Sequence, residues 1–158
     1  MNPKPRPTPV VAHDSADQRV PADVVLAFLN ALADGDTDTA LSLVAEDIVY
    51  ANVSLPTIRG KERFARSARA FYRYGLGFEV RVHRIAENGP SVLTERSDAI
   101  LLGPIRAQFW VCGVFEVHDG QIQLWRDYFD WGDVMLGTLH GLVGAIVPRL
   151  RARFPETR

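Results

Sequence analysis

The chain has 158 residues, 47% of them hydrophobic, and a formal net charge of −1 at pH 7. This length suits one domain of about 100–200 residues, and the apolar content is sufficient for a buried core, so disorder is not the default expectation. The near-zero charge gives no general basis for binding nucleic acid, and the single Cys112 excludes an intrachain disulfide and suits a reducing compartment.

Helices are predicted for the first half of the chain, after a flexible lead. Residues 1–20 carry four prolines and little apolar periodicity, so we expect them to lie outside a single domain over residues 21–158. Pro21 can begin a helix whose apolar residues recur at helical spacing. A second short helix is expected over residues 36–44 and a third over residues 61–74. The third carries five basic residues, which we interpret as a solvated face and not a nucleic-acid site, because no aromatic-rich sheet motif accompanies them.

Strands dominate the second half. Alternating apolar residues predict strands over residues 47–54, 78–85, 92–102, 105–117 and 121–129. Asn88-Gly89 and Asp119-Gly120 are typical hairpin turns. Helices that precede a meander of long strands indicate an α+β fold with an antiparallel-rich sheet.

The tail from Val134 to Val147 is apolar on nearly every side and contains three glycines. We expect a buried helix that closes the open side of a curved sheet, with the small residues allowing close approach to another surface. The alternative is a membrane-surface contact, helped by the arginines that follow. The chain has no apolar signal core and no run of about 18 apolar residues, so we predict a soluble, cytoplasmic protein.

One strand places two charges on an apolar face. Arg96 and Asp98 are two residues apart in the strand over residues 92–102, so their side chains share one face. Burying charge is costly unless it is paired, and the pair therefore needs a reason. A structural salt bridge is one explanation, and a catalytic site is the other.

The last strand favours the catalytic explanation. Asp127 shares its face with Trp125 and Phe129. If the sheet brings Asp127 near the first pair, two carboxylates flank one guanidinium, whose planar fork can hold both. Two carboxylates in one apolar pocket do not both ionise easily, so one can donate a proton while the other acts as a base. Tyr50 and Asn52, on one face of the first strand, can hold a water molecule, and the whole set suits the addition of water across a strained leaving oxygen.

Other chemistries fit the sequence less well. No nucleophile elbow of the Gly-x-Ser-x-Gly type and no dinucleotide or phosphate loop occurs. The four histidines lack the spacing of metal ligands, so no metal site is predicted.

The motifs Tyr50-x-Asn52, Arg96-x-Asp98 and Trp125-Arg-Asp-Tyr-Phe-Asp resemble, in this order and spacing, the limonene-1,2-epoxide hydrolase family. The segment that leads into the last motif is similar to the mycobacterial branch of this family. The resemblance implies a cone-shaped, strongly curved mixed sheet with N-terminal helices and a C-terminal helix closing the pocket. This fold is shared with the nuclear transport factor 2-like, or SnoaL-like, superfamily. It also implies a homodimer that needs no cofactor.

The resemblance further implies roles for the site residues. Asp127 would deprotonate a water molecule that Tyr50 and Asn52 also hold. Asp98 would donate a proton to the epoxide oxygen, and Arg96 would bridge the two aspartates. Attack in one step, without a covalent intermediate, would give a vicinal diol. The implied pocket lining is Val80, Ile100, Phe109, Val111, Phe129 and Leu142.

Two alternatives remain open, because a fold does not determine a function. The first is an isomerase, cyclase or dehydratase on the same scaffold, which would not obviously need the water site of Tyr50 and Asn52. The second is a binder of small apolar ligands without catalysis. The leading hypothesis is an epoxide hydrolase whose partners are a small apolar epoxide and water.

Overall fold

The structure, a computed structural model, describes residues 20–150 and 153–154. The helices are α1 (Pro21–Ala33), α2 (Thr37–Ser42), α3 (Lys61–Arg73) and α4 (Trp131–Ile146), followed by the 3-10 turn η1 (Pro148–Leu150). The strands are β1 (Val44–Asn52), β2 (Ile58–Arg59), β3 (Leu76–Asn88), β4 (Ser91–Leu102), β5 (Ile105–His118) and β6 (Gln121–Tyr128). The predicted flexible segment 1–20 lies outside the described residues, except for Val20.

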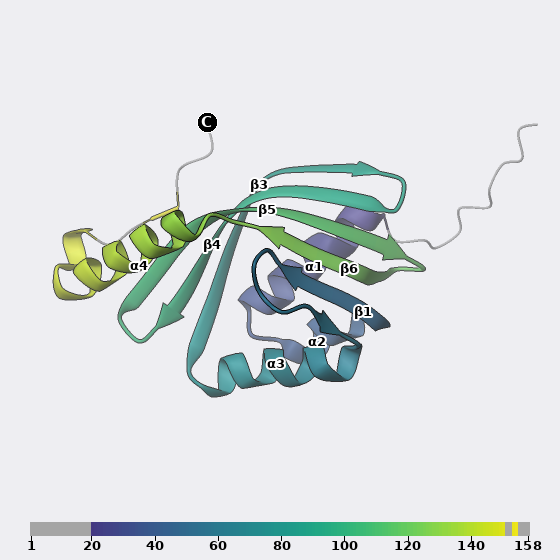
Figure 1. Cartoon of the computed structure of the whole chain (residues 1–158), viewed down its shortest axis with the longest axis horizontal. Coiled ribbons are helices and arrows are strands. Elements are labelled where there is room, and N and C mark those ends of the chain that lie inside the picture. Colours follow the sequence, from purple (N-terminus) through teal and green to yellow (C-terminus); the bar gives the residue numbers. More distant parts are fainter. Residues whose placement is uncertain (1–19, 151–152, 155–158) are drawn as a thin grey trace, which may run out of the picture.

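The described strands form one curved, open sheet in the order β2-β1-β6-β5-β4-β3 (Figure 1). All neighbouring pairs are antiparallel except β1 and β6, which run parallel. Register shifts within the β1/β6, β3/β4 and β5/β6 pairs interrupt the ladders, and such irregularities bend a sheet. The predicted α+β fold with a curved mixed sheet is therefore confirmed.

The boundaries of the early elements differ from the prediction. The second helix ends at Ser42, and β1 begins at Val44, three residues before the predicted strand. Asp36 caps α2 by accepting a hydrogen bond from the Thr39 backbone N–H at 3.0 Å. The apolar residues from Val44 onward belong to β1. The sequence did not reveal this boundary, because a short apolar run fits the end of a helix as well as the start of a strand.

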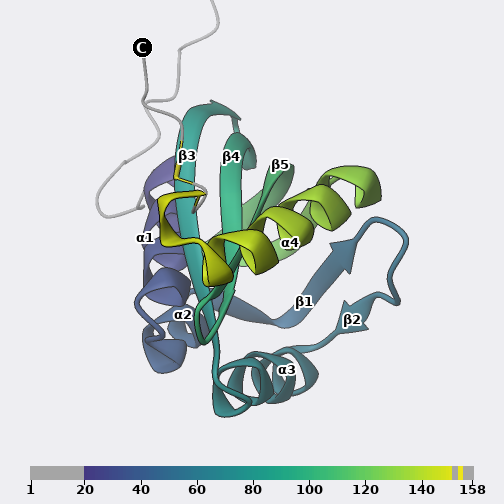
Figure 2. The same ribbon diagram turned by 90° about the vertical axis from the view of Figure 1, so that its left-hand side faces the viewer.

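The hydrophobic core lies between the helices α1–α3 and one face of the sheet. Helix α1 packs against β3, β4, β5 and β6, whereas α3 packs against β1, β2 and β3 (Figure 2). Phe28 of α1 and Phe64 of α3 meet Trp125 of β6 in this core, with ring centroids 5.1 and 6.1 Å from the indole. These packed rings fix the sheet face that carries Arg96 and Asp127.

Helix α4 lies against β5, apart from the other helices (Figures 1 and 2). Residues 105–111 of β5 have no partner in β6, and α4 covers their free edge. A Cβ atom on Gly137 would lie 2.0 Å from the Gln108 carbonyl oxygen, and one on Gly141 would lie 2.6 Å from that of Arg106. The prediction that the small residues allow close approach to another surface is confirmed.

The prediction that α4 is buried on all sides was wrong. The buried residues of the helix are Gly137, Gly141 and Gly144, whereas Met135, Leu136, Leu139 and Ile146 are each more than half exposed. Among the described elements, those that pack against α4 are β5 and the adjoining turn η1, so the side of the helix opposite β5 is left exposed. In the part of the chain that the structure describes, no helix has both the length and the apolar character needed to cross a membrane.

Candidate active site

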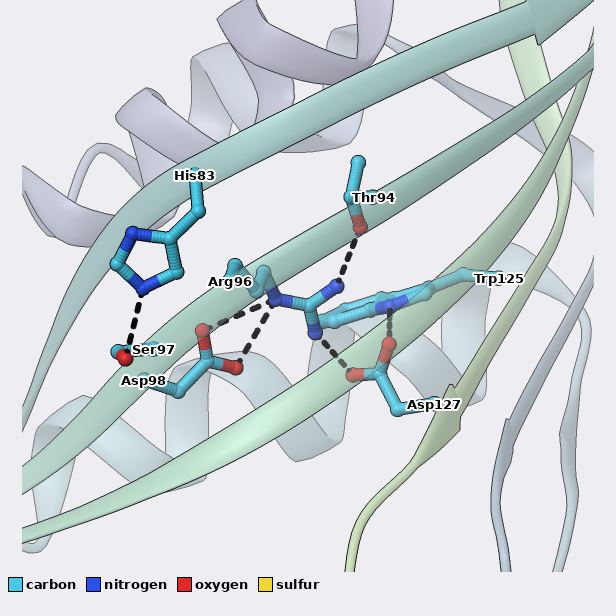
Figure 3. A network of polar contacts seen from close by, with 7 residues as sticks. All are labelled: His83, Thr94, Arg96, Ser97, Asp98, Trp125 and Asp127. Atoms are coloured by element: carbon cyan, nitrogen blue, oxygen red, sulfur yellow. Dashed lines mark hydrogen bonds and ion pairs between the residues drawn. The ribbon is translucent and has the colours of Figure 1, made fainter. Parts of the chain in front are cut away.

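A guanidinium group lies between two carboxylates on the concave face of the sheet (Figure 3). Arg96 Nε donates to both carboxylate oxygens of Asp98, at 2.9 and 3.1 Å. Its Nη2 donates to Asp127 Oδ2 at 2.5 Å, and its Nη1 donates to the Thr94 hydroxyl at 3.1 Å. The Arg96 side chain has no exposed surface, and both aspartates are more than nine-tenths buried.

Strand order explains this arrangement only partly. Arg96 and Asp98 lie on β4 and Asp127 lies on β6, but β5 runs between these two strands. The guanidinium therefore reaches its second carboxylate across an intervening strand. Along the register, Thr94 of β4 lies opposite Gly113 of β5, which lies opposite Asp127.

The second oxygen of Asp127 has its own donor. Trp125 Nε1 donates to Asp127 Oδ1 at 2.7 Å, and the two residues share one face of β6. The indole ring is fixed by stacking on Phe115, with centroids 5.9 Å apart, and by contact with Tyr50 at 4.4 Å. Asp127 thus receives two charge-assisted hydrogen bonds from different residues, whereas Asp98 receives its bonds from Arg96 alone.

Tyr50 and Asn52 reach the site from the other side of β6. In the parallel β1/β6 pair, Tyr50 lies opposite Trp125 and Asn52 lies opposite Asp127. The Asn52 side-chain amide donates to the Tyr50 hydroxyl at 2.7 Å. Burial, and next the charge of Asp127, raise the pKa of Tyr50, so its phenol is neutral and can donate a hydrogen bond.

Burial dominates the ionisation of the two aspartates. It raises the pKa of Asp98 from its ordinary value of 3.8 to about 6, although the charge of Arg96 lowers it. Burial also raises the pKa of Asp127, against the opposing effects of Arg96 and of the Trp125 hydrogen bond. Burial alone would lower the pKa of Arg96, but the charges of the two aspartates outweigh it and raise that pKa. The guanidinium is therefore the permanent charge of the site.

A cavity of about 290 Å³ opens above this network and is lined mainly by apolar side chains. Tyr50, Asn52, Asp98 and Asp127 are among the polar residues of its wall, whereas Arg96 is not part of the lining. Among the predicted pocket residues, the structure places four in the lining: Ile100, Phe109, Val111 and Phe129. The cavity can accordingly hold an apolar molecule with one reactive polar group directed at the aspartates.

Two predicted pocket residues lie outside the lining. Val80 is partly buried and packs against the hydrophobic core. Leu142 follows Gly141 on α4, and the contact of that glycine with β5 leaves Leu142 half exposed on the outer side. The first turn of α4 supplies Trp131 and Val134 to the cavity instead.

Besides cavity-lining residues such as Trp131, three residues in or beside the hydrogen-bond network of Arg96 were missed in the sequence or received no role there. Thr94 and Trp125 are each two residues from a site residue on the same strand, and this spacing could have indicated both. Gly113 interrupts an inward-facing row of large residues in β5, and an isolated glycine within a strand often marks a close approach.

Within residues 20–150 and 153–154, no three His, Cys, Asp or Glu side chains are grouped in a way that could hold a metal ion.

The fold and the site define a class of protein: a curved α+β sheet with a buried Asp–Arg–Asp centre beneath an apolar cavity. The family model for the limonene-1,2-epoxide hydrolase catalytic domain matches residues 19–140. The chain belongs to this family.

Individual proteins agree with the family assignment. The chain is 54% identical to epoxide hydrolase EphG of Mycobacterium tuberculosis over 128 residues, which cover 81% of this chain and 85% of that protein. The solved structure of an M. tuberculosis limonene-epoxide-hydrolase-like epoxide hydrolase aligns with a TM-score of 0.81 at 51% identity, covering 85% of this chain and 95% of that one. A nuclear transport factor 2-like protein from Cytophaga hutchinsonii aligns with a TM-score of 0.61 at 21% identity, covering 75% and 97% of the two chains, and shares the fold.

Proposed function

We propose that the protein hydrolyses a small apolar epoxide to a vicinal diol in one step, by general acid and base catalysis. The observation that carries this proposal is the pair of buried carboxylates that share one guanidinium at the wall of an apolar cavity. Membership of the limonene-1,2-epoxide hydrolase family, and the similarity to proteins named epoxide hydrolases, support the reaction class.

Charge balance supports a division of labour between the aspartates. If both were ionised beside one guanidinium, the buried centre would carry a net negative charge, which is costly. One bound proton makes the centre neutral. Asp127 accepts hydrogen bonds from two separate N–H groups, of Arg96 and Trp125, whereas the two oxygens of Asp98 share one N–H of Arg96, so the ionised form of Asp127 is the better stabilised of the two. Asp98 therefore holds the proton and acts as the acid, and Asp127 acts as the base.

The reaction keeps this balance. Asp98 donates its proton to the epoxide oxygen as a carbon–oxygen bond of the ring breaks. A water molecule, held by Tyr50, Asn52 and Asp127, attacks the ring carbon and gives its proton to Asp127. The centre is neutral before and after the step, because Asp98 loses one proton to the epoxide oxygen and Asp127 gains one from the water. Proton exchange with solvent then restores the starting protonation of both aspartates. General acid–base assistance of this kind contributes about 10²–10⁴-fold in rate.

Arg96 is a positioning residue in this scheme, since it does not line the cavity. Its fixed positive charge stabilises whichever aspartate is ionised, and its hydrogen bonds hold both carboxylates in place. Tyr50 stays neutral and supplies a hydroxyl to the water.

The test is diol formation in oxygen-18 water under single-turnover conditions, with limonene oxide, cyclohexene oxide, a fatty-acid epoxide and a sterol epoxide. Label in the diol after the first turnover is expected, because water attacks directly. Unlabelled diol would mean that a protein carboxylate attacks first. Absence of diol from every epoxide would overturn the proposed function. For the isomerase and cyclase alternative, solved structures with such names align at 16–21% identity, which shows the shared fold alone.

We also propose that the protein is a homodimer. The outer face of α4 carries exposed Met135, Leu136, Leu139 and Ile146, and a contiguous apolar surface of this kind favours association. A cytoplasmic location is proposed as well, on the basis of the free Cys112.

A further inference from the structure

Gly113 is the point at which Arg96 crosses the sheet. Adjacent strands are about 4.8 Å apart, so β4 and β6 are separated by about twice that distance with β5 between them. At this row of the sheet, β5 presents a glycine between Thr94 and Asp127. The guanidinium occupies the space that a side chain at this position would fill.

The space beside the Gly113 Cα atom is filled by the side chains of neighbouring residues. A Cβ atom on Gly113 would lie 2.2 Å from Arg96 Nη1, 2.7 Å from Thr94 Oγ1 and 3.0 Å from Asp127 Oδ1. The neighbouring inward residues of β5, Val111 and Phe115, are both buried large side chains. A glycine in this row is therefore not explained by a need for a turn, since it lies in the middle of a continuous strand.

The guanidinium group of Arg96 is held in place by hydrogen bonds and by burial. Arg96 is completely buried and bonded to Asp98, Thr94 and Asp127 through all three of its nitrogens. Its central carbon also lies 5.9 Å from the Phe115 ring and 6.0 Å from the Trp125 ring. An added methyl group at residue 113 can be accommodated only if Arg96 withdraws from Thr94 and Asp127.

We propose that Gly113 is a positioning residue of the epoxide-opening site, whose missing side chain lets Arg96 reach across β5 and hold the acid and the base together. The inference rests on the proposed function.

The test compares Gly113→Ala with the wild-type protein in kcat and KM for a soluble cyclic epoxide between pH 5 and 9. We expect kcat to fall by about 10-fold to 100-fold, because a misplacement of about 1 Å costs up to 10²-fold, while KM stays within about threefold. Since the Arg96 charge lowers the pKa of Asp127, the low-pH limb of kcat/KM should move to higher pH. A merely structural role for the glycine would leave that limb in place.

Gly77→Ala is the matched control. Gly77 lies in β3, and the atoms nearest to an added Cβ belong to the Leu101 side chain, the first of them at 3.1 Å. This variant should keep its kcat within about threefold and its pH profile unchanged. If Gly113→Ala behaves like this control, the inference is wrong.

A second variant, Arg96→Lys, removes the fork that crosses the strand while keeping the charge. In that background, Gly113→Ala should change kcat by less than about threefold, because coupled residues are not additive. An equal loss in both backgrounds would overturn the inference. If Gly113→Ala alone is unfolded at 25 °C, the double variant should recover folded protein by circular dichroism, and failure to recover would also overturn it. Failure of the proposed function is distinguishable, since the wild-type protein itself would then form no diol.

Discussion

The buried carboxyl of Asp98 makes the stability of the protein depend on pH, and Asp98→Asn should remove the part of that dependence that belongs to Asp98. The pKa of Asp98 is raised by burial from 3.8 to about 6 in the folded protein. The folded state therefore binds a proton more tightly than the unfolded state does. The free energy of unfolding is highest below about pH 4 and falls as the pH rises through 6.

The magnitude follows from the difference in pKa. A difference of about two corresponds to about 3 kcal/mol, since one pKa unit is about 1.4 kcal/mol. The residue is almost fully buried, so screening by solvent is small. Asp127 contributes with the same sign, because its pKa is also raised. Comparison with the variant isolates the part that belongs to Asp98.

The assay is urea unfolding, followed by circular dichroism, at intervals between pH 4 and 7.5. The wild-type protein should lose about 3 kcal/mol or more over this range, and Asp98→Asn should lose correspondingly less. The control is Asp47→Asn, at an exposed carboxylate of β1, which should keep the wild-type slope. Parallel slopes for wild type and Asp98→Asn would refute the reasoning that burial holds a proton on this residue.

Further variants test the site and the outer face of α4. Asp127→Asn should lower kcat by about 10²–10⁴-fold in the diol assay while circular dichroism shows an intact fold, because the base is lost. Asn52→Ala should lower epoxide turnover by about 10-fold or more, since the water is held less well. Trp125→Phe removes a hydrogen bond that lowers the pKa of Asp127, so the low-pH limb of kcat/KM should move upward. Leu139→Asp should shift the protein from dimer to monomer in sedimentation experiments, because a charge enters an apolar contact.

Three of these variants have a matched control. Asp47→Asn is the control for Asp127→Asn. A similar loss of kcat in these two variants would contradict the role of Asp127 as the base. Trp110→Phe removes an exposed indole from the other face of the sheet and should leave the pH profile unchanged. Tyr74→Asp introduces the same charge as Leu139→Asp at an exposed residue after α3 and should not alter the oligomeric state. A monomeric wild-type protein would contradict the homodimer itself.

Much of the fold could be predicted because its signals are local. The alternation of apolar residues in β4 and β5 depends only on neighbours two positions apart, and it placed Arg96 and Asp98 on one face. The same argument applied to Asp127 on β6. The position of Val44, by contrast, was misassigned, since a short apolar segment fits the end of a helix as well as the start of a strand.

The outer surface of α4 could not be predicted from its composition. An apolar helix is expected to be buried, but burial depends on which elements surround it. Here Gly137 and Gly141 make the close contact with β5, and Leu139 and Ile146 are left outside. For the same reason Leu142 lies away from the cavity, although the family resemblance implied a place in the lining.

The sequence by itself determined which residues share a face, because side-chain direction within a strand alternates regardless of the rest of the chain. It therefore determined the pairs Arg96 with Asp98 and Trp125 with Asp127. Only the tertiary structure decided that these pairs meet, because strand order and register result from contacts between segments distant in the chain. β5 lies between them, and the meeting depends on Gly113, where the absence of a side chain leaves the space that the guanidinium fills.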